Sequence, residues 1–269
     1  MRTTTYIIRK NMKIEIQKQD LKNVLDKNPL RYTKSISLEL SNLCNYSNIH
    51  TKCPTNWIKE KTVMSLSLIE KAFKEIGKYD YKRYLAPWCF SEPLIDPRLY
   101  VVLDMFKKYV PNGKLNIVTN GFFLYRPIVE ELIGRGVDVI CISIYDKKDM
   151  MRFKNLKKEI EQDNLPIKIL FKKRYPLKTK MTDNFIGIYE GKKLPDRICL
   201  APYRTLMINP NGDIGLCCWD WKNTITFGSI VNNSFKEILT SNKAIEMNLN
   251  LRKGKRHLYD LCSRCPARK

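Results

Sequence analysis

Histidine is nearly absent from this chain of 269 residues, which contains only His50 and His257. That scarcity argues against zinc or non-haem iron sites built mainly from imidazole ligands. Long apolar runs are absent as well, because the longest, Val137–Tyr145, is about half the ~20 residues that a membrane span requires. The first ten residues are polar and basic and contain no apolar stretch typical of a secretory signal. We therefore expect a cytoplasmic protein without a membrane partner.

Acidic residues are in the minority, with 27 against 49 basic residues, a formal net charge of +22 and a pI near 9.6. Such a charge attracts anions, from nucleic acids to phosphorylated or nucleotide-linked metabolites. The basic residues are scattered, however, with no five like charges in succession and no base-stacking module. This pattern favours a solvated basic surface over a nucleic-acid site. The 11 glycines form no glycine-rich nucleotide loop, so the sequence predicts no adenine contacts.

After a polar extension over residues 1–33, strand-like and helix-like segments alternate regularly. Within the extension, only residues 12–16 and 20–26 suggest a strand and a short helix. The expected strands that follow are 35–41, 84–90, 115–119, 137–145, 166–171 and 185–189, and the expected helices are 65–78, 97–109, 127–135 and 147–162. Strands separated by helix-length segments predict a parallel sheet, open or rolled into a barrel, with ligands at the carboxyl ends of the strands.

The alternation stops near residue 190, so we place one domain over residues 34–190 and a second, smaller one over residues 191–269. Residues 205–218 predict a β-hairpin, because they contain two alternating segments around the pair Asn211–Gly212, and Asn-Gly is typical of two-residue hairpin turns. Two short helices are expected after the hairpin, beginning near Ser234 and Asn242.

Nine cysteines are the most informative residues of the chain. Their odd number and the lack of a secretory signal argue against a disulfide framework, whereas clustered thiols in a reducing compartment more often bind metal. Four lie in the C-terminal domain: Cys199, Cys217, Cys262 and Cys265. The last two form a knuckle whose thiolates point at one centre. Cys218 adjoins Cys217, and the sequence does not decide between them. Spacing alone leaves both a zinc site and a fully ligated iron–sulfur cluster open.

Two further cysteines, Cys44 and Cys53, lie directly after the first expected strand. Three later segments follow the next strands in turn: Phe90-Ser-Glu-Pro, Val118-Thr-Asn-Gly and Cys141-Ile-Ser-Ile-Tyr-Asp. In this order they resemble the corresponding segments of the radical S-adenosylmethionine (SAM) enzymes. The C-terminal domain resembles the SPASM domain in its short "twitch" form, with cysteine spacings most similar to those of aminocyclitol-oxidising members of the family.

The resemblance implies an α/β fold, a partial (β/α)6 barrel followed by a small hairpin-and-helix domain, with SAM and two [4Fe–4S] clusters as cofactors. The auxiliary cluster would be held by Cys199, Cys217, Cys262 and Cys265. The first cluster would be held by Cys44, Cys53 and a third ligand. The family supplies a third cysteine, whereas here His50 stands in its place and the interval before it is two residues longer than usual. We predict His50 as that ligand, and the alternatives are a loop with two ligands or loss of the cluster.

The resemblance also implies which residues hold SAM and what the reaction is. The residues expected to contact SAM are Phe90, Ser91, Glu92, Asn120 and Ser143. Arg174 and Asp220 are candidates to bind or deprotonate a substrate hydroxyl. In this family a 5′-deoxyadenosyl radical removes hydrogen from a substrate C–H bond, and a fully ligated auxiliary cluster accepts the second electron. We therefore expect oxidation of a sugar-like or cyclitol-like small molecule, with flavodoxin or ferredoxin as electron donor.

Three alternatives stay open at this point. Peptide modification is common among relatives with full SPASM domains, although residues 1–33 are too few for the leader-binding domain that many of them carry. An epimerase would need a spare thiol as hydrogen donor, from Cys89, Cys141 or Cys218, and the first two are more typical of core thiols. A non-enzymatic scaffold that keeps only the auxiliary cluster would contain about four irons in place of about eight.

Overall fold

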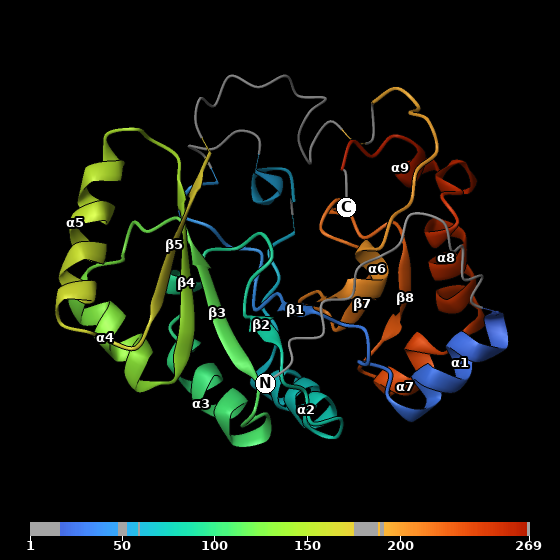
Figure 1. Cartoon of the computed structure of the whole chain (residues 1–269), viewed down its shortest axis with the longest axis horizontal. Helices are drawn as coiled ribbons and strands as arrows, with labels where there is room; N and C mark the ends of the chain where they lie inside the picture. The colour runs from blue at the N-terminus through green and yellow to red at the C-terminus, as the bar shows by residue number, and fades with distance from the viewer. Residues whose placement is uncertain (1–16, 48–52, 59, 175–187, 189–190, 268–269) are drawn as a thin grey trace, which may run out of the picture.

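The computed structural model describes residues 17–47, 53–58, 60–174, 188 and 191–267. In this part of the chain the strands form an eight-stranded sheet in the order β5-β4-β3-β2-β1-β6-β7-β8 (Figure 1). The strands are β1 (Ser35–Leu38), β2 (Tyr84–Ala86), β3 (Lys114–Thr119), β4 (Val137–Ile144), β5 (Lys168–Lys173), β6 (Thr205–Ile208), β7 (Asp213–Gly215) and β8 (Thr226–Ser229).

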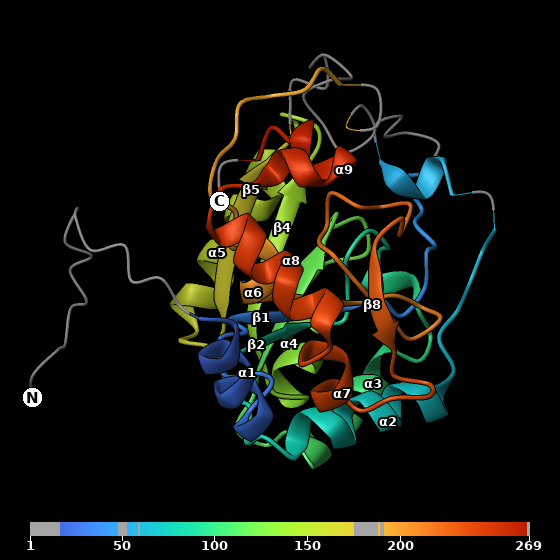
Figure 2. The same ribbon diagram turned by 90° about the vertical axis from the view of Figure 1, so that its right-hand side faces the viewer.

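The helices that connect the parallel strands lie along the outer side of the sheet (Figure 1). They are α2 (Leu66–Gly77), α3 (Leu99–Tyr109), α4 (Arg126–Gly134) and α5 (Asp149–Gln162). The remaining helices are α1 (Lys18–Lys27), α6 (Ala201–Arg204), α7 (Phe235–Leu239), α8 (Asn242–Arg252) and α9 (Asp260–Ser263), with 3-10 turns η1 (Pro54–Asn56), η2 (Pro93–Ile95) and η5 (Arg256–Leu258). Helix α1 packs against α7 and α8, which joins the N-terminal segment to the C-terminal half of the chain (Figure 2).

Helix boundaries agree with the predicted ones to within about two residues because local side chains fix them. The Ser65 hydroxyl accepts a hydrogen bond of 3.2 Å from the Leu68 amide and so begins α2. At α7, Ser234 and Glu237 exchange hydrogen bonds in a capping box. The predicted hairpin is confirmed as β6 and β7, and Gly212 in its turn has the positive φ of 85° that glycine adopts without strain.

Strand β6 occupies a place that the sequence did not predict. It pairs in parallel with β1, from Ser35–Thr205 to Leu38–Ile208, on the side of β1 opposite β2. The C-terminal hairpin therefore extends the same sheet, and β6 is the sixth strand of its parallel part. The expected strand 185–189 lies outside the described residues except for Ile188, which is in a 3-10 turn, and the expected strand 12–16 lies outside them entirely.

Strand β2 ends at Ala86, although the pattern predicted a strand as far as Phe90. The reason is a buried carboxylate: Glu39 Oε2 accepts from the Phe90 amide at 2.7 Å and Oε1 accepts from the Ser91 amide at 2.9 Å. These amides are turned toward β1 and take no part in a strand ladder. The segment after β2 is thereby a loop at the carboxyl edge of the sheet.

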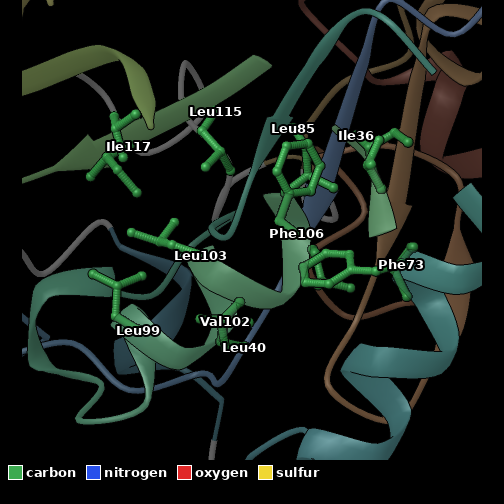
Figure 3. Close-up of a cluster of buried hydrophobic side chains, with 14 of the residues drawn as sticks. Ile36, Leu40, Phe73, Leu85, Leu99, Val102, Leu103, Phe106, Leu115 and Ile117 are labelled. Carbon is green, nitrogen blue, oxygen red and sulfur yellow. The ribbon is translucent and has the colours of Figure 1, made fainter. Parts of the chain in front are cut away.

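The main core lies between the sheet and helices α2 and α3. Figure 3 shows Phe73 and Phe106 beside the strand residues Ile36 and Leu85. The two phenylalanine rings meet edge to face with centroids 5.5 Å apart. All four side chains are fully buried, and burial of one such side chain stabilises the fold by about 1.5–3 kcal/mol. This core fixes the strands whose carboxyl ends carry the site. Among the described residues, no helix has the length and apolar character needed to cross a membrane.

Candidate cofactor and substrate site

A cavity of 410 Å³ lies at the carboxyl ends of the parallel strands, where the topology predicts a ligand site. We call it the barrel cavity. Eight residues singled out from the sequence line it together: Cys44, Cys53, Phe90, Ser91, Glu92, Asn120, Ser143 and Arg174. They come from segments up to 130 residues apart, so the fold gathers them at one place. Their individual roles remain predictions.

The thiols of Cys44 and Cys53 face this cavity from the loop after β1. Both have hydrogen-bond partners nearby: the Tyr46 amide donates to Cys44 Sγ at 3.4 Å, and Cys53 Sγ lies 3.1 Å from the Thr55 hydroxyl. Burial raises the pKa of Cys44 to about 12, and the negative charge of Cys53 adds to the rise. Two nearby thiols that resist ionisation in this way become thiolates when a cation neutralises them. His50 lies outside the described residues, so its predicted ligation stays a prediction.

Glu92 joins the loops after β1, β2 and β3. Its carboxylate accepts from the Thr119 hydroxyl and from the Asn120 amide, both at 2.6 Å, and its own amide donates to the Leu43 carbonyl at 2.9 Å. Burial raises the pKa of Glu92, and these donors oppose the rise. The amides of Ser91 and Glu92 both donate within the protein, to Glu39 and to the Leu43 carbonyl. Only the carbonyl oxygens of this backbone segment are able to accept from an ammonium group.

Glu39 is a site residue that the sequence reasoning missed. It is buried at the end of β1, and its two carboxylate oxygens hold the amides of Phe90 and Ser91. Burial raises its pKa to about 7, against the opposing effect of hydrogen bonds from Ser91 and Phe90. A strand pattern that alternates polar and apolar residues made Glu39 look solvent-facing. A buried carboxylate that holds two successive amides sets the shape of the predicted SAM-binding loop.

Asn120 and Gly121 form the turn after β3. The Asn120 side chain donates to Asn45 Oδ1 at 2.7 Å and accepts from the Phe122 amide at 2.9 Å, so it links this turn to the cysteine loop. Gly121 has a φ of 77°, and a Cβ atom there would lie 2.4 Å from the ring of Phe153. Only glycine therefore fits this turn without a shift of the neighbouring core.

The four predicted auxiliary ligands surround a second, narrow cavity that we call the auxiliary cavity. Its walls contain Cys199, Cys217, Cys262 and Cys265, together with apolar residues of the C-terminal segment. Cys218 lies in the wall of the barrel cavity, so the two adjacent cysteines face different cavities. This placement favours Cys217 over Cys218 as the ligand.

The residues of the auxiliary cavity fit a metal group held by thiolates. Four thiols and several apolar side chains line one narrow space. Four thiolate donors suit either a zinc ion or an iron–sulfur cluster, so the lining alone leaves both groups open.

The two candidate catalytic residues have different surroundings. Arg174 follows β5 and lines the barrel cavity, as predicted. Asp220 is buried in the loop after Cys218 and is not among the residues that line this cavity. Its carboxylate accepts from the Thr224 hydroxyl and amide and from the Ile225 amide, at 2.8–2.9 Å. These bonds give Asp220 a part in the shape of its own loop, and its role toward a substrate stays a prediction.

Residues 199–266 match the SPASM family, described as an iron–sulfur cluster-binding domain. The chain is similar to the S-adenosyl-L-methionine-dependent 2-deoxy-scyllo-inosamine dehydrogenase of Niallia circulans, with 19% identity over 232 residues, which are 86% of this chain and 91% of that protein.

Two kinds of solved structure share the fold. The crystal structure of BtrN in complex with AdoMet and 2-DOIA matches with a TM-score of 0.72 and 19% identity, over 87% of this chain and 93% of that one. Native anSMEcpe with bound AdoMet matches with a TM-score of 0.54 and 12% identity, over 86% and 90% of the two chains. The chain shares the fold of these two proteins, and its residues 199–266 match the SPASM iron–sulfur cluster-binding domain.

Proposed function

We propose that this protein oxidises a hydroxyl group of a sugar-like or cyclitol-like small molecule. One observation carries the proposal: Cys218 lies in the wall of the barrel cavity, and the adjacent Cys217 lies in the wall of the auxiliary cavity. A substrate in the barrel cavity would therefore be one residue away from the auxiliary ligands. Such proximity suits a reaction in which a second electron has to leave the substrate.

The chain's own residues would bind and orient both molecules. When bound, SAM and the two clusters supply a 5′-deoxyadenosyl radical for hydrogen abstraction and an acceptor for one electron. The carbonyl oxygen of Ser91 is the backbone atom of this loop suited to accept from the methionyl ammonium group. Arg174 and Lys172 place positive charge in the same wall, which suits a hydroxyl, a phosphate or another anionic substituent of the substrate.

Similarity to known proteins supports the same substrate class. The relative from Niallia circulans is named for an aminocyclitol, and the BtrN structure contains 2-DOIA. At 19% identity this likeness supports a hydroxylated ring of that general kind and not one particular compound. An external one-electron donor of the flavodoxin or ferredoxin type completes the proposal, and the net charge of +22 would attract an acidic one.

The test is an anaerobic turnover assay with the reconstituted full-length protein. SAM, dithionite and a panel of cyclitols, aminocyclitols and sugars, free and phosphorylated, are supplied, and 5′-deoxyadenosine and carbonyl product are both measured. We expect one class of ring compound to raise both products together, and Cys44→Ala to abolish both. Absence of 5′-deoxyadenosine with every reductant and substrate would overturn the enzyme proposal and favour a scaffold.

Epimerisation is a second candidate because two thiols besides Cys44 and Cys53 line the barrel cavity. Cys218 and Cys89 both lie in its wall, with Cys89 Sγ 3.9 Å from the sulfur of Met207. Cys141 lies in β4 and is not among the residues of that wall, so it is the weakest of the three predicted donors. Turnover in heavy water distinguishes the outcomes: an epimerase introduces one deuterium at carbon, whereas a dehydrogenase forms a ketone with no such label. Loss of the label in Cys218→Ala would identify the donor.

A further inference from the structure

Arg256 is buried to an unusual degree for an arginine. Only 2% of it is exposed, and it is the largest fully buried side chain among the described residues. Its guanidinium donates to four backbone carbonyls at 3.0–3.2 Å, namely those of Arg197, Ile198, Cys265 and Ala267. These bonds tie the segment before Cys199 to the end of the cysteine knuckle.

Among the described residues no carboxylate pairs directly with this buried charge, although the buried carboxylate of Asp220 lies within electrostatic range of Cys262, as Arg256 does. Within the described part of the chain, Arg256 forms no ion pair, whereas the neighbouring Arg264 pairs with Asp260 at 2.7 Å. Carbonyl dipoles solvate a guanidinium, but they carry no net charge to balance it. Burial of an unbalanced charge is costly, so buried cations normally lie beside an anion.

Besides the carboxylate of Asp220 near Cys262, the groups able to supply negative charge here are the cysteines. Arg256 lines the auxiliary cavity together with the four predicted ligands. Burial raises the pKa of the Cys262 and Cys265 thiols, and the positive charge of Arg256 opposes that rise. The guanidinium is thus placed to balance thiolates and whatever anionic group they hold.

We propose that Arg256 is the counter-charge of the auxiliary iron–sulfur cluster and raises its reduction potential. The inference rests on the proposed function, since it concerns the cluster that serves as electron acceptor there. A cluster held by four thiolates carries net negative charge, and reduction adds one more negative charge to a site with little water. A fixed positive charge beside it stabilises the reduced form more than the oxidised form. The auxiliary cluster would thereby become the better acceptor.

The experiment is a redox titration of the anaerobically reconstituted full-length protein, followed by electron paramagnetic resonance. The auxiliary signal is identified as the one that SAM leaves unchanged. Three variants are compared: Arg256→Gln removes the charge, Arg256→Lys keeps it, and Arg264→Gln removes a charge that is already paired and partly exposed. Iron content is measured for every sample.

We expect Arg256→Gln to lower the potential. At the wild-type midpoint, its ratio of reduced to oxidised cluster should fall at least tenfold, which corresponds to 59 mV for a one-electron couple. Arg256→Lys and Arg264→Gln should stay near the wild-type midpoint. A glutamine variant with a full cluster at the wild-type potential would refute the inference and leave Arg256 as a purely structural tie.

The lysine variant keeps the test decisive if the glutamine variant does not incorporate the auxiliary cluster. A loaded lysine variant at the wild-type potential supports the charge effect, whereas one with a lowered potential contradicts it. Loss of the cluster in both variants also contradicts it, because Arg256 would then be required for assembly and not for potential. Wild-type protein that lacks any SAM-insensitive signal would refute the auxiliary cluster itself, and with it the electron acceptor of the proposed function.

Discussion

Replacement of Glu39 by glutamine tests whether this buried carboxylate shapes the predicted SAM-binding loop. Both of its oxygens accept from backbone amides, Phe90 at 2.7 Å and Ser91 at 2.9 Å. Glutamine has nearly the same shape but offers one oxygen and one NH2 group. One backbone N–H would therefore face another N–H, and the loop would lose one charge-assisted hydrogen bond.

The size of the effect follows from that single bond. A hydrogen bond to a charged group contributes about 1.5–3 kcal/mol. If this free energy is needed to order the loop for SAM, the dissociation constant for SAM rises about tenfold or more in Glu39→Gln, since each 1.4 kcal/mol is about tenfold. The effect is largest where wild-type Glu39 is ionised, because only the carboxylate accepts from both amides.

The pH dependence sharpens the test. The pKa of Glu39 is raised from 4.5 to about 7, so about nine-tenths of it is ionised at about pH 8 and about one-tenth at about pH 6. Wild-type affinity for SAM should fall toward that of the variant as the pH falls through 7. The sign for global stability is opposite: the folded chain holds this proton more tightly than the unfolded chain, so the contribution of Glu39 to stability decreases as the pH rises from 4.5 to 7.

Isothermal titration calorimetry with SAM under anaerobic conditions measures the dissociation constant at pH 6 and at pH 8. At each pH, the constant of the variant is divided by that of the wild type. Glu60→Gln is the matched control, because it makes the same chemical change at an exposed position on the same loop as Cys53. We expect a large ratio at pH 8 that shrinks at pH 6 for Glu39→Gln, and a ratio near one at both pH values for Glu60→Gln. Equal affinity of wild type and Glu39→Gln at pH 8 would refute the role given to this carboxylate.

Three further predictions concern the auxiliary site and two turns. Cys217→Ala should lower the iron content by about four atoms per chain and Cys218→Ala should leave it unchanged; the reverse result would exchange the assigned ligand. Gly121→Ala should destabilise the cluster-loaded protein by about 1–3 kcal/mol, because Gly121 has a positive φ and a Cβ atom there would clash with the core. Gly134→Ala should stabilise it by about 0.5–1 kcal/mol, because Gly134 is helical and has open space around it. Similar melting temperatures of the two variants would contradict this. Asp220→Asn should lower the free energy of unfolding by about 2 kcal/mol without a change in the KM for substrate, and a selective rise in KM would return Asp220 to the substrate site.

Much of the parallel sheet was predictable because its elements have strong local signals. The segment 137–145 is almost entirely apolar, as a strand buried on both faces has to be, and it became β4 (Val137–Ile144). Helix α2 combined a regular apolar face with a serine at its start. In such segments the local sequence signals agree with one another, so the type of element could be predicted without knowledge of the tertiary packing.

The position of β6 was not predictable in this way. Thr205–Ile208 pairs with β1 at a separation of 170 residues, and no local pattern in either segment identifies the partner. Both strands are short: β1 is apolar on alternate residues, and β6 has three apolar residues in succession. These patterns are equally consistent with a separate hairpin domain. The shared sheet depends on how the two halves of the chain pack together.

The spacing of the cysteines allowed most of the candidate site to be predicted from the sequence, but it could not distinguish between two adjacent cysteines. The sequence located both groups of thiols, but it could not decide between Cys217 and Cys218. Their side chains face different cavities, and this direction is set by the folded backbone and not by the position in the sequence. Burial of the carboxylates was equally hidden. Glu39 accepts from amides of the loop after β2, and Asp220 accepts from amides of its own loop; only the folded backbone shows where those amides lie.

The central claim is that the loop with Cys44 and Cys53 holds an iron–sulfur cluster that SAM reaches. Electron paramagnetic resonance of the dithionite-reduced, fully loaded protein, recorded with and without SAM, tests it most directly. The account predicts two cluster signals, of which SAM alters one, and loss of that one signal in Cys44→Ala and in Cys53→Ala. Spectra that SAM leaves unchanged, and that respond only to substitution of the C-terminal cysteines, would contradict it.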